Sequence, residues 1–148
     1  MAPGSPFTFW MRRSALFQTT SSVFSPGGTT FSFVEHYRYG EPGGPVQGAQ
    51  VCLGDAWIQL AVARDDRASP AQCGRRTQSL TVFVADVDAH YDRARAAGVA
   101  IVEELHETVY GERQYGAEDL EGHHWLFSRH ARDVSPEEWG ATVAGTRA

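Results

Sequence analysis

Histidine side chains are the first groups in this 148-residue chain whose type and spacing could do chemistry. The chain has six of them, and His123 and His124 are adjacent in a stretch that reads as a strand. Successive strand residues point to opposite faces, so these two cannot bind one metal ion together. His124 is the best candidate for an acid, a base or a hydrogen bond to a ligand, because an unperturbed imidazole titrates near neutral pH. A satisfied or partly exposed strand histidine is the plainer alternative.

Aromatic and amide side chains could hold a ligand without reacting with it. Trp57 could stack on a planar ligand while Gln59 hydrogen-bonds to it. A dimer contact explains an aromatic residue at this position equally well. No GxSxG, P-loop, GxGxxG or HExxH motif occurs in the sequence. Nucleophilic, phosphoryl-transfer and dinucleotide chemistry therefore have no support.

The stretch from Ser79 to Phe127 must position most of these groups. Its alternation of apolar and other residues predicts a strand that begins the unit. Asp86 caps a helix, and Gly98 stands where a left-handed C-terminal cap is needed. Three further extended pieces are expected, over Ala100 to Leu105, Glu112 to Ala117 and His123 to Phe127.

The period of two also predicts which strand residues face a ligand. The residues expected to pack in the core are Leu80, Val82, Val84, Trp125, Phe127, Ile58 and Leu60. Their strand neighbours then point to the other face: Ser79, Thr81, Phe83, His124, Leu126, Trp57 and Gln59. The predicted pocket is aromatic and amide-lined, with one histidine.

The rest of the chain predicts strands separated by turns. Residues 1–30 carry Pro and Gly too often for a full helix, although Met11 to Thr19 could form about two turns. Residues 64–77 read as a linker. Ser135 and Glu138 form a capping box, with Pro136 at the first helical position, for a short C-terminal helix through Trp139. The three strands expected in the first half are Phe31 to Tyr39, Val46 to Leu53 and Ala56 to Ala63.

This order of elements resembles one βαβββ module of the vicinal oxygen chelate superfamily, which includes glyoxalase I, bleomycin- and fosfomycin-resistance proteins and extradiol dioxygenases. The run is most similar to the PhnB-like, glyoxalase-like subgroup. The resemblance implies an α+β fold in which βαβββ modules form a cupped mixed sheet, with the first module incomplete or irregular at its N-terminus. The residues that carry it are Val84 to Ala89, Ala94 to Gly98, Tyr110 to Arg113 and Asp119 to Trp125.

The resemblance also implies a division of the chain and a set of site residues. The expected parts are an irregular segment over 1–30, the back half of a first module over 31–63, a linker over 64–77, a complete second module over 78–130, and a short helix and tail over 131–148. Tyr110 and Arg113 border the pocket in relatives, although a surface role is open for both. The candidate ligand-binding residues are Gln50, Trp57, Gln59, Ser79, Phe83, Tyr110, Arg113 and His124.

Enzymes of this superfamily hold a divalent metal with His, Gln and Glu side chains, which this sequence does not retain. The family's ligand positions fall on Gly48 and Gln50 in the first module, and on Ser79 and Leu126 in the second. Only Gln50 of these is a plausible ligand, and one neutral amide is too weak to hold a dication. No metal and no other cofactor is therefore expected, and these positions are expected to surround one shared cup.

Composition limits the partners. The net charge of −5 and the sequence pI of about 5.6 argue against nucleic acid or an anionic membrane. Two isolated cysteines, no signal peptide and no apolar run of roughly 20 residues make a cytoplasmic chain the expectation. A missing strand and helix in the first module would expose a sheet edge, so a homodimer with exchanged elements is expected.

Three hypotheses for function remain. The leading one is a metal-independent binder that sequesters a small molecule between aromatic walls, similar to bleomycin-resistance proteins. The second is a metal-dependent lyase or dioxygenase of the glyoxalase class, which elemental analysis would reveal. The third is a degraded paralogue, whose N-terminus limited proteolysis would trim by about 30 residues.

Overall fold

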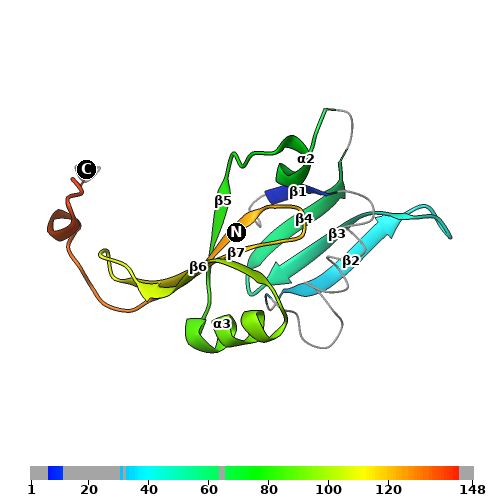
Figure 1. The fold of residues 1–148 in the computed structure, drawn as a ribbon. Helices are drawn as coiled ribbons and strands as arrows, with labels where there is room; N and C mark the ends of the chain where they lie inside the picture. The colour runs from blue at the N-terminus through cyan, green and yellow to red at the C-terminus, as the bar shows by residue number, and fades with distance from the viewer. Residues whose placement is uncertain (1–6, 12–30, 32, 64–65, 144–148) are drawn as a thin grey trace, which may run out of the picture.

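The structure is a computed structural model, and it describes residues 7–11, 31, 33–63 and 66–143. Two four-stranded sheets make up most of the described chain (Figure 1). The first sheet has the order β1-β4-β3-β2 and the second β5-β8-β7-β6. Each sheet therefore uses the strands of one half of the chain, as expected for two successive modules. The strands of the first sheet are β1 (Phe7–Met11), β2 (Val34–Gly40), β3 (Val46–Leu53) and β4 (Ala56–Val62).

The first sheet contains a strand that the sequence analysis missed. β1 pairs in parallel with β4, with Thr8 opposite Gln59 and Trp10 opposite Ala61. An irregular segment was expected here because Pro3, Gly4 and Pro6 stand just before it. Five residues suffice for this strand because β4 supplies its hydrogen-bonding partners. The two helical turns expected over Met11 to Thr19 lie outside the described residues, apart from Met11, which ends β1.

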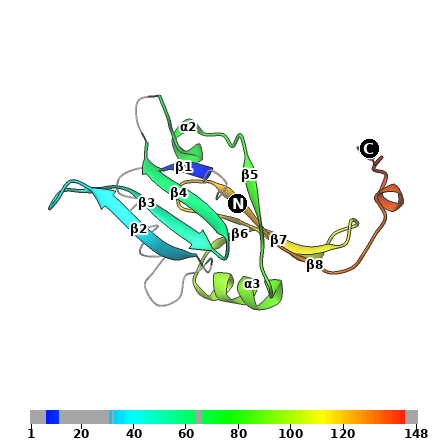
Figure 2. The same cartoon turned by 180° about the vertical axis from the view of Figure 1, so that it is seen from behind.

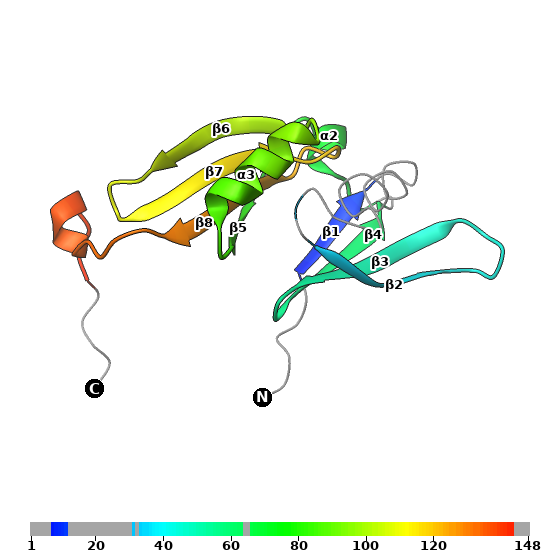
Figure 3. The same cartoon turned by 90° about the horizontal axis from the view of Figure 1, so that it is seen from below.

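The second sheet has the element order predicted for a complete module. α3 (Val87–Ala96) follows the first strand, and the Asp86 side chain accepts a hydrogen bond from the Ala89 N–H at 3.0 Å. Gly98 has the predicted left-handed conformation, with φ of 75°. α3 lies across one face of this sheet (Figure 3). The four strands are β5 (Ser79–Phe83), β6 (Ala100–Glu107), β7 (Glu112–Glu118) and β8 (His124–His130).

A short helix interrupts the segment expected to be a linker. α2 (Pro70–Cys73) begins with a capping box, in which the Ser69 N–H donates to Oε1 of Gln72 at 2.9 Å. Ser69 is fully buried, and the Ala71 N–H donates to the Glu121 carbonyl at 2.9 Å. The linker is thus fixed to the turn between β7 and β8.

The C-terminal segment forms a 3-10 turn, η2 (Pro136–Trp139), where a short helix was predicted. The Ser135 N–H donates to Oε1 of Glu138 at 3.0 Å, so the predicted capping box is present. η2 and the β2–β3 hairpin lie at opposite ends of the molecule (Figure 2). Among the described residues, no helix combines the length and the apolar character that a bilayer span needs.

Both sheets contribute to a single apolar core. Phe31 and Phe33, which were predicted to begin β2, instead precede it and are fully buried. The Phe33 ring lies 5.6 Å from the Trp125 ring, and the Phe31 ring lies 4.8 Å from the Phe127 ring. The core also contains Ala49, Val51, Ile58 and Leu60 of the first sheet and Val87, Tyr91, Ala94, Tyr115 and Ala117 of the second module.

Candidate functional site

Each sheet has a core face, which carries the buried residues, and an open face opposite to it. On the second sheet, Trp125 and Phe127 of β8 are buried, while His124 and Leu126 between them are half-buried. Phe83 of β5 is 67% exposed. The alternation along β5 and β8 therefore runs as the sequence predicted, and it places Ser79, Thr81, Phe83, His124 and Leu126 on the open face.

The open face of the first sheet carries aromatic and amide side chains. Gln50 and Gln59 are register partners, and Trp57 stands opposite Cys52. A register shift in β2 between Glu35 and Tyr37 marks a β-bulge at His36. A bulge lets two consecutive residues face the same side, and it often re-aims a side chain.

His36 and Tyr37 are residues of this face that sequence reasoning missed. Nδ1 of His36 lies 3.2 Å from Oε1 of Gln50, and the His36 ring meets the Trp57 ring edge-on at 4.9 Å. The Tyr37 ring lies 5.3 Å from the His36 ring. His36, Tyr37, Gln50 and Trp57 thus form one cluster, which we call the aromatic cluster.

The two open faces do not form one hollow within the chain. Ile58 and Leu60 of the first sheet share a core with Trp125 and Phe127 of the second, so the opposite faces point away from that core. Gln50 lies on one open face, and Ser79 and Leu126 lie on the other. This corrects the expectation that these three positions surround a single cup in one chain. Periodicity assigns a face to each residue but does not orient two sheets relative to each other.

His124 is a partly accessible titratable group on the second open face, on the inner strand β8. Neither of its ring nitrogens has a hydrogen-bond partner among the described residues. Partial burial lowers the pKa of His124, and the nearby charge of Arg76 lowers it further, while Glu103 opposes both. The ring is therefore neutral at neutral pH, and its nitrogens can serve as one donor and one acceptor.

Gly116 makes room for the His124 ring. A Cβ atom at this position would lie 2.9 Å from Nε2 of His124 and 2.9 Å from Cβ of Glu103. Cβ atoms that face each other across two strands normally stay about 4.5–5.5 Å apart. Glu103 and His124 thus converge over a glycine, in a strand interior where glycine is otherwise unfavourable.

Glu103 is held in place by a short chain of hydrogen bonds. Nε2 of Gln114 donates to Oε1 of Glu103 at 2.9 Å, and the Tyr110 hydroxyl donates to Oε1 of Gln114 at 3.0 Å. His106 also approaches Oε1 of Glu103, at 3.4 Å. In the sequence, Glu103 and His106 lie in a charged run that is typical of a solvated strand edge. The available signal was Gly116, a glycine inside a predicted strand.

Arg113 does not join the other candidate residues. Its guanidinium forms two hydrogen bonds to Oδ1 of Asp88 in α3, at 3.0 and 2.6 Å, and so lies on the helical side of the second sheet. Tyr110 does border the open face, through Gln114, and its ring meets the Trp139 ring of η2 at 5.9 Å. Tyr110 precedes β7, whereas Arg113 lies within it, where the alternation of side chains turns Arg113 to the helical side.

Comparison with known proteins gives the family. The sequence profile of the Glyoxalase/Bleomycin resistance protein/Dioxygenase superfamily matches residues 26–127, which is more than half of the chain. This chain belongs to that superfamily. Its fold agrees with the family: TioX from Micromonospora sp. ML1 superposes with a TM-score of 0.63 at 26% identity, covering 88% of this chain and 98% of TioX.

Two further comparisons extend this result. The fosfomycin resistance protein FosX from Listeria monocytogenes superposes with a TM-score of 0.58 at 15% identity, covering 93% of this chain and 98% of that one, which shows the shared fold. Uncharacterised proteins of Mycobacterium bovis and Mycobacterium tuberculosis are 29% identical over 99 residues, or 67% of this chain. The matched region spans 64% and 57% of the lengths of these relatives.

The described residues do not fit the metal centre of the superfamily's metal-dependent enzymes. Ser79 and Leu126, to which the resemblance assigns two of the ligand positions, lie on β5 and β8, and Leu126 offers no donor atom. Gln50 lies on the other sheet. Within residues 7–11, 31, 33–63 and 66–143, no group of three His, Cys, Asp or Glu side chains is arranged to hold a metal ion.

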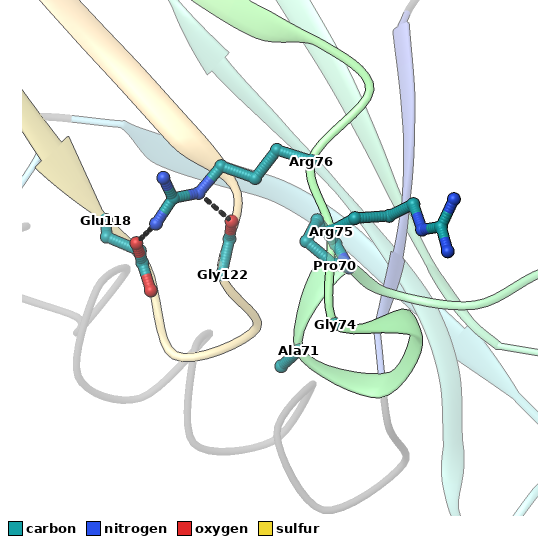
Figure 4. A pocket seen from close by; sticks show the side chains of 7 residues that line it. All are labelled: Pro70, Ala71, Gly74, Arg75, Arg76, Glu118 and Gly122. Carbon is teal, nitrogen blue, oxygen red and sulfur yellow. Dashed lines mark hydrogen bonds and ion pairs between the residues drawn. The ribbon is translucent and has the colours of Figure 1, made fainter.

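A pocket of about 360 Å³ lies beside α2, and Glu118, the register partner of His124, lines one side of it (Figure 4). Arg76 forms an ion pair with Glu118, and its Nε donates to the Gly122 carbonyl at 3.2 Å. Arg75 points away from these groups in the same view. None of the sequence-predicted site residues lines this pocket. We regard it as the junction between the linker and the β7–β8 turn.

Proposed function

We propose that this superfamily member binds a small planar organic ligand, without a metal ion, in a cup that two copies of the chain build together. In this proposal the open face of the first sheet in one copy meets the open face of the second sheet in the other. The supporting observation is the shared core, because it leaves the two open faces of one chain directed away from each other. Each chain alone offers only half of a cup.

The chemistry of the two faces supports a binding role. The aromatic cluster offers rings for stacking and the Gln50 amide for hydrogen bonding. The second face offers His124, whose nitrogens are unpaired among the described residues, beside the apolar side chains of Leu126 and Phe83. Within this superfamily, this combination supports our proposal of a bleomycin-resistance type of binder. We also propose that the protein belongs to the PhnB-like subgroup and is cytoplasmic. The free thiols of Cys52 and Cys73 support the cytoplasmic location.

Solution mass and ligand titration together test the proposal. Light scattering after size exclusion should give twice the mass of the 16.3 kDa chain. Titration with planar aromatic compounds should change the fluorescence saturably in the wild type, and should lose most of that change in Trp57→Phe. A monomer, or a signal unaffected by Trp57→Phe, would overturn the two-copy cup.

Metal content tests the rival function, a metal-dependent lyase or dioxygenase. Elemental analysis of protein purified without chelators should find no stoichiometric Ni, Zn, Fe or Mn. A stoichiometric metal that is lost together with ligand binding on dialysis against chelator would support a metal-dependent lyase or dioxygenase instead.

A further inference from the structure

The space above Gly116 is flanked by two polar atoms that no described residue uses. One of them, Nε2 of His124, accepts a hydrogen bond in the tautomer that carries its proton on Nδ1. A Cβ built on Gly116 would lie 2.9 Å from Nε2 of His124 and 3.4 Å from Oε2 of Glu103. No hydrogen bond or ion pair links these two side chains in the described part of the chain. The two atoms therefore converge on one point above Gly116. A ligand N–H group that lies farther out over this glycine, on the open side of the sheet, would face both.

Glu103 is pre-oriented for this role. Its Oε1 accepts a hydrogen bond from Gln114 and is approached by His106, whereas Oε2 has no partner among the residues that the structure describes. Gln114 is 7% exposed and is itself fixed by the Tyr110 hydroxyl. Holding one carboxylate oxygen in a network leaves the other at a defined position, which lowers the entropy lost when a ligand binds.

The charges around the gap favour a donor over an anion. Arg76, whose charge acts on His124, is already paired with Glu118 and with the Gly122 carbonyl. His106 is occupied by Glu103 and by the Glu104 carbonyl. A ligand carboxylate or phosphonate in the gap would meet the Glu103 carboxylate without a free cation to offset it, whereas an N–H donor would be accepted by both atoms.

We propose that His124 and Glu103 bind a cationic nitrogen group of the ligand, an amine or an amidinium, with Nε2 of His124 and Oε2 of Glu103 accepting its N–H donors above Gly116. This inference deepens the proposed function by naming the ligand class of the same cup. The ligand is then planar where it meets the aromatic cluster of one copy and basic where it meets the second sheet of the other. An amidinium attached to an aromatic ring is the smallest compound with both properties.

Three isosteric probes test the class of ligand. The full-length protein is titrated with benzamidine, benzamide and benzoate while the ¹H–¹⁵N NMR signals of Gly116 and its neighbours are followed. We expect benzamidine to shift the Gly116 signal saturably and to bind about tenfold more tightly than benzamide, because charge-assisted hydrogen bonds are roughly twice as strong as neutral ones. Benzoate should not shift it. No saturable shift with benzamidine, or equal binding of benzoate, would overturn the proposal.

Variants locate the site. Glu103→Gln keeps the shape but removes the charge, and should reduce benzamidine affinity about tenfold, to that of benzamide. Glu107→Gln, an exposed change on the same strand, should leave both affinities unchanged. Gly116→Ala places a methyl group in the gap and should abolish binding of both compounds. Since the added Cβ also crowds Glu103 and His124 and strains the fold, Glu103→Gln is decisive: unchanged benzamidine affinity would refute the role of Glu103.

The outcome separates this inference from the proposed function. Suppose that the protein is a dimer and that Trp57→Phe reduces the fluorescence change caused by planar ligands, but that Glu103→Gln leaves benzamidine affinity unchanged. The two-copy cup is then supported and the cationic site is refuted. If the protein is monomeric yet benzamidine binding depends on Glu103, the cup falls and the cationic site stands.

Discussion

Two histidines on opposite faces of the second sheet show how differently one residue type can be used. His90 of α3 is 1% exposed, and its Nδ1 lies 2.7 Å from the Tyr115 hydroxyl. His124 of β8 is half-buried, and its ring nitrogens have no partner in the described chain. Burial is the largest cause that lowers the pKa of both. A lowered pKa alone therefore does not mark a functional histidine, because the availability of its nitrogens differs between the core face and the open face.

The largest expected difference between the core face and the open face of the second sheet is the loss of stability when a phenylalanine ring is removed. Phe127→Ala removes a fully buried ring that stacks on Tyr115 and Trp125, and should cost about 3–5 kcal/mol of unfolding free energy. The matched change Phe83→Ala, at a ring that is 67% exposed, should stay within about 0.5 kcal/mol. Urea denaturation of both variants measures the difference. Similar losses would mean that the open face is buried in solution, as it would be in a dimer whose interface is needed for stability.

A smaller contrast is expected for two tyrosine hydroxyls. Tyr115→Phe deletes the partner of the buried His90 and should cost about 1–3 kcal/mol, because a buried polar atom loses its hydrogen bond. Tyr110→Phe removes a hydroxyl that bonds to Gln114 at the edge of the open face, and should cost about 1 kcal/mol or less. The same denaturation experiment ranks them. A greater loss at Tyr110 would show that the network leading to Glu103 supports the fold and is not merely available for a ligand.

The pH dependence of stability should depend on His90 more than on His124. A histidine with a lowered native pKa binds fewer protons in the native than in the unfolded state, so stability falls as pH drops below the unfolded pKa of about 6.5. His90 is the more buried of the two, and His90→Gln should flatten the decline between pH 7.5 and 5.5 more than His124→Gln. Denaturation midpoints across this range give the measurement. A larger effect of His124→Gln would indicate that His124 is buried in solution.

The pKa of His130 is shifted in the opposite direction, so this residue serves as the internal control. Glu112 and Asp133 raise the pKa of His130, so its contribution is present below about pH 6.5 and is lost as pH rises through the native pKa. The ring is exposed, so solvent screens both contacts. His130→Gln should therefore make the decline toward acid pH slightly steeper. A flatter curve would contradict the assignment.

The sequence predicted faces and elements better than it predicted contacts between them. The period of two in β5 and β8 correctly separated Leu80 and Trp125 from Ser79 and His124, because each choice depends only on local alternation. β1 was missed because its pairing with β4 outweighs the Pro and Gly residues before it. The bulge that turns His36 toward Trp57 depends on register with β3, which no local pattern encodes.

The candidate site could not be predicted in full for the same reason, because it depends on contacts between strands. Glu103 and Gly116 come from different strands, and their approach follows from irregular pairing of β6 with β7, so the sequence alone showed only a glycine within a strand. The separation of the two open faces follows from the shared core, which is a property of the whole chain. Transferring the ligand positions of relatives onto this sequence could not reveal that the two open faces are separate.

The smallest effect is expected for Arg113→Gln, and this variant distinguishes the site predicted from the sequence from the site seen in the structure. Arg113 was predicted to bind the ligand, but it pairs with Asp88 on the helical side of the sheet. Arg113→Gln should leave benzamidine affinity unchanged, and should barely alter stability because exposed ion pairs contribute little. Glu103→Gln, on the other face, should weaken binding about tenfold in the same titration. If Arg113→Gln weakened binding as much, the guanidinium would have to leave Asp88 when the ligand arrives, and the division between core face and open face would no longer locate the site.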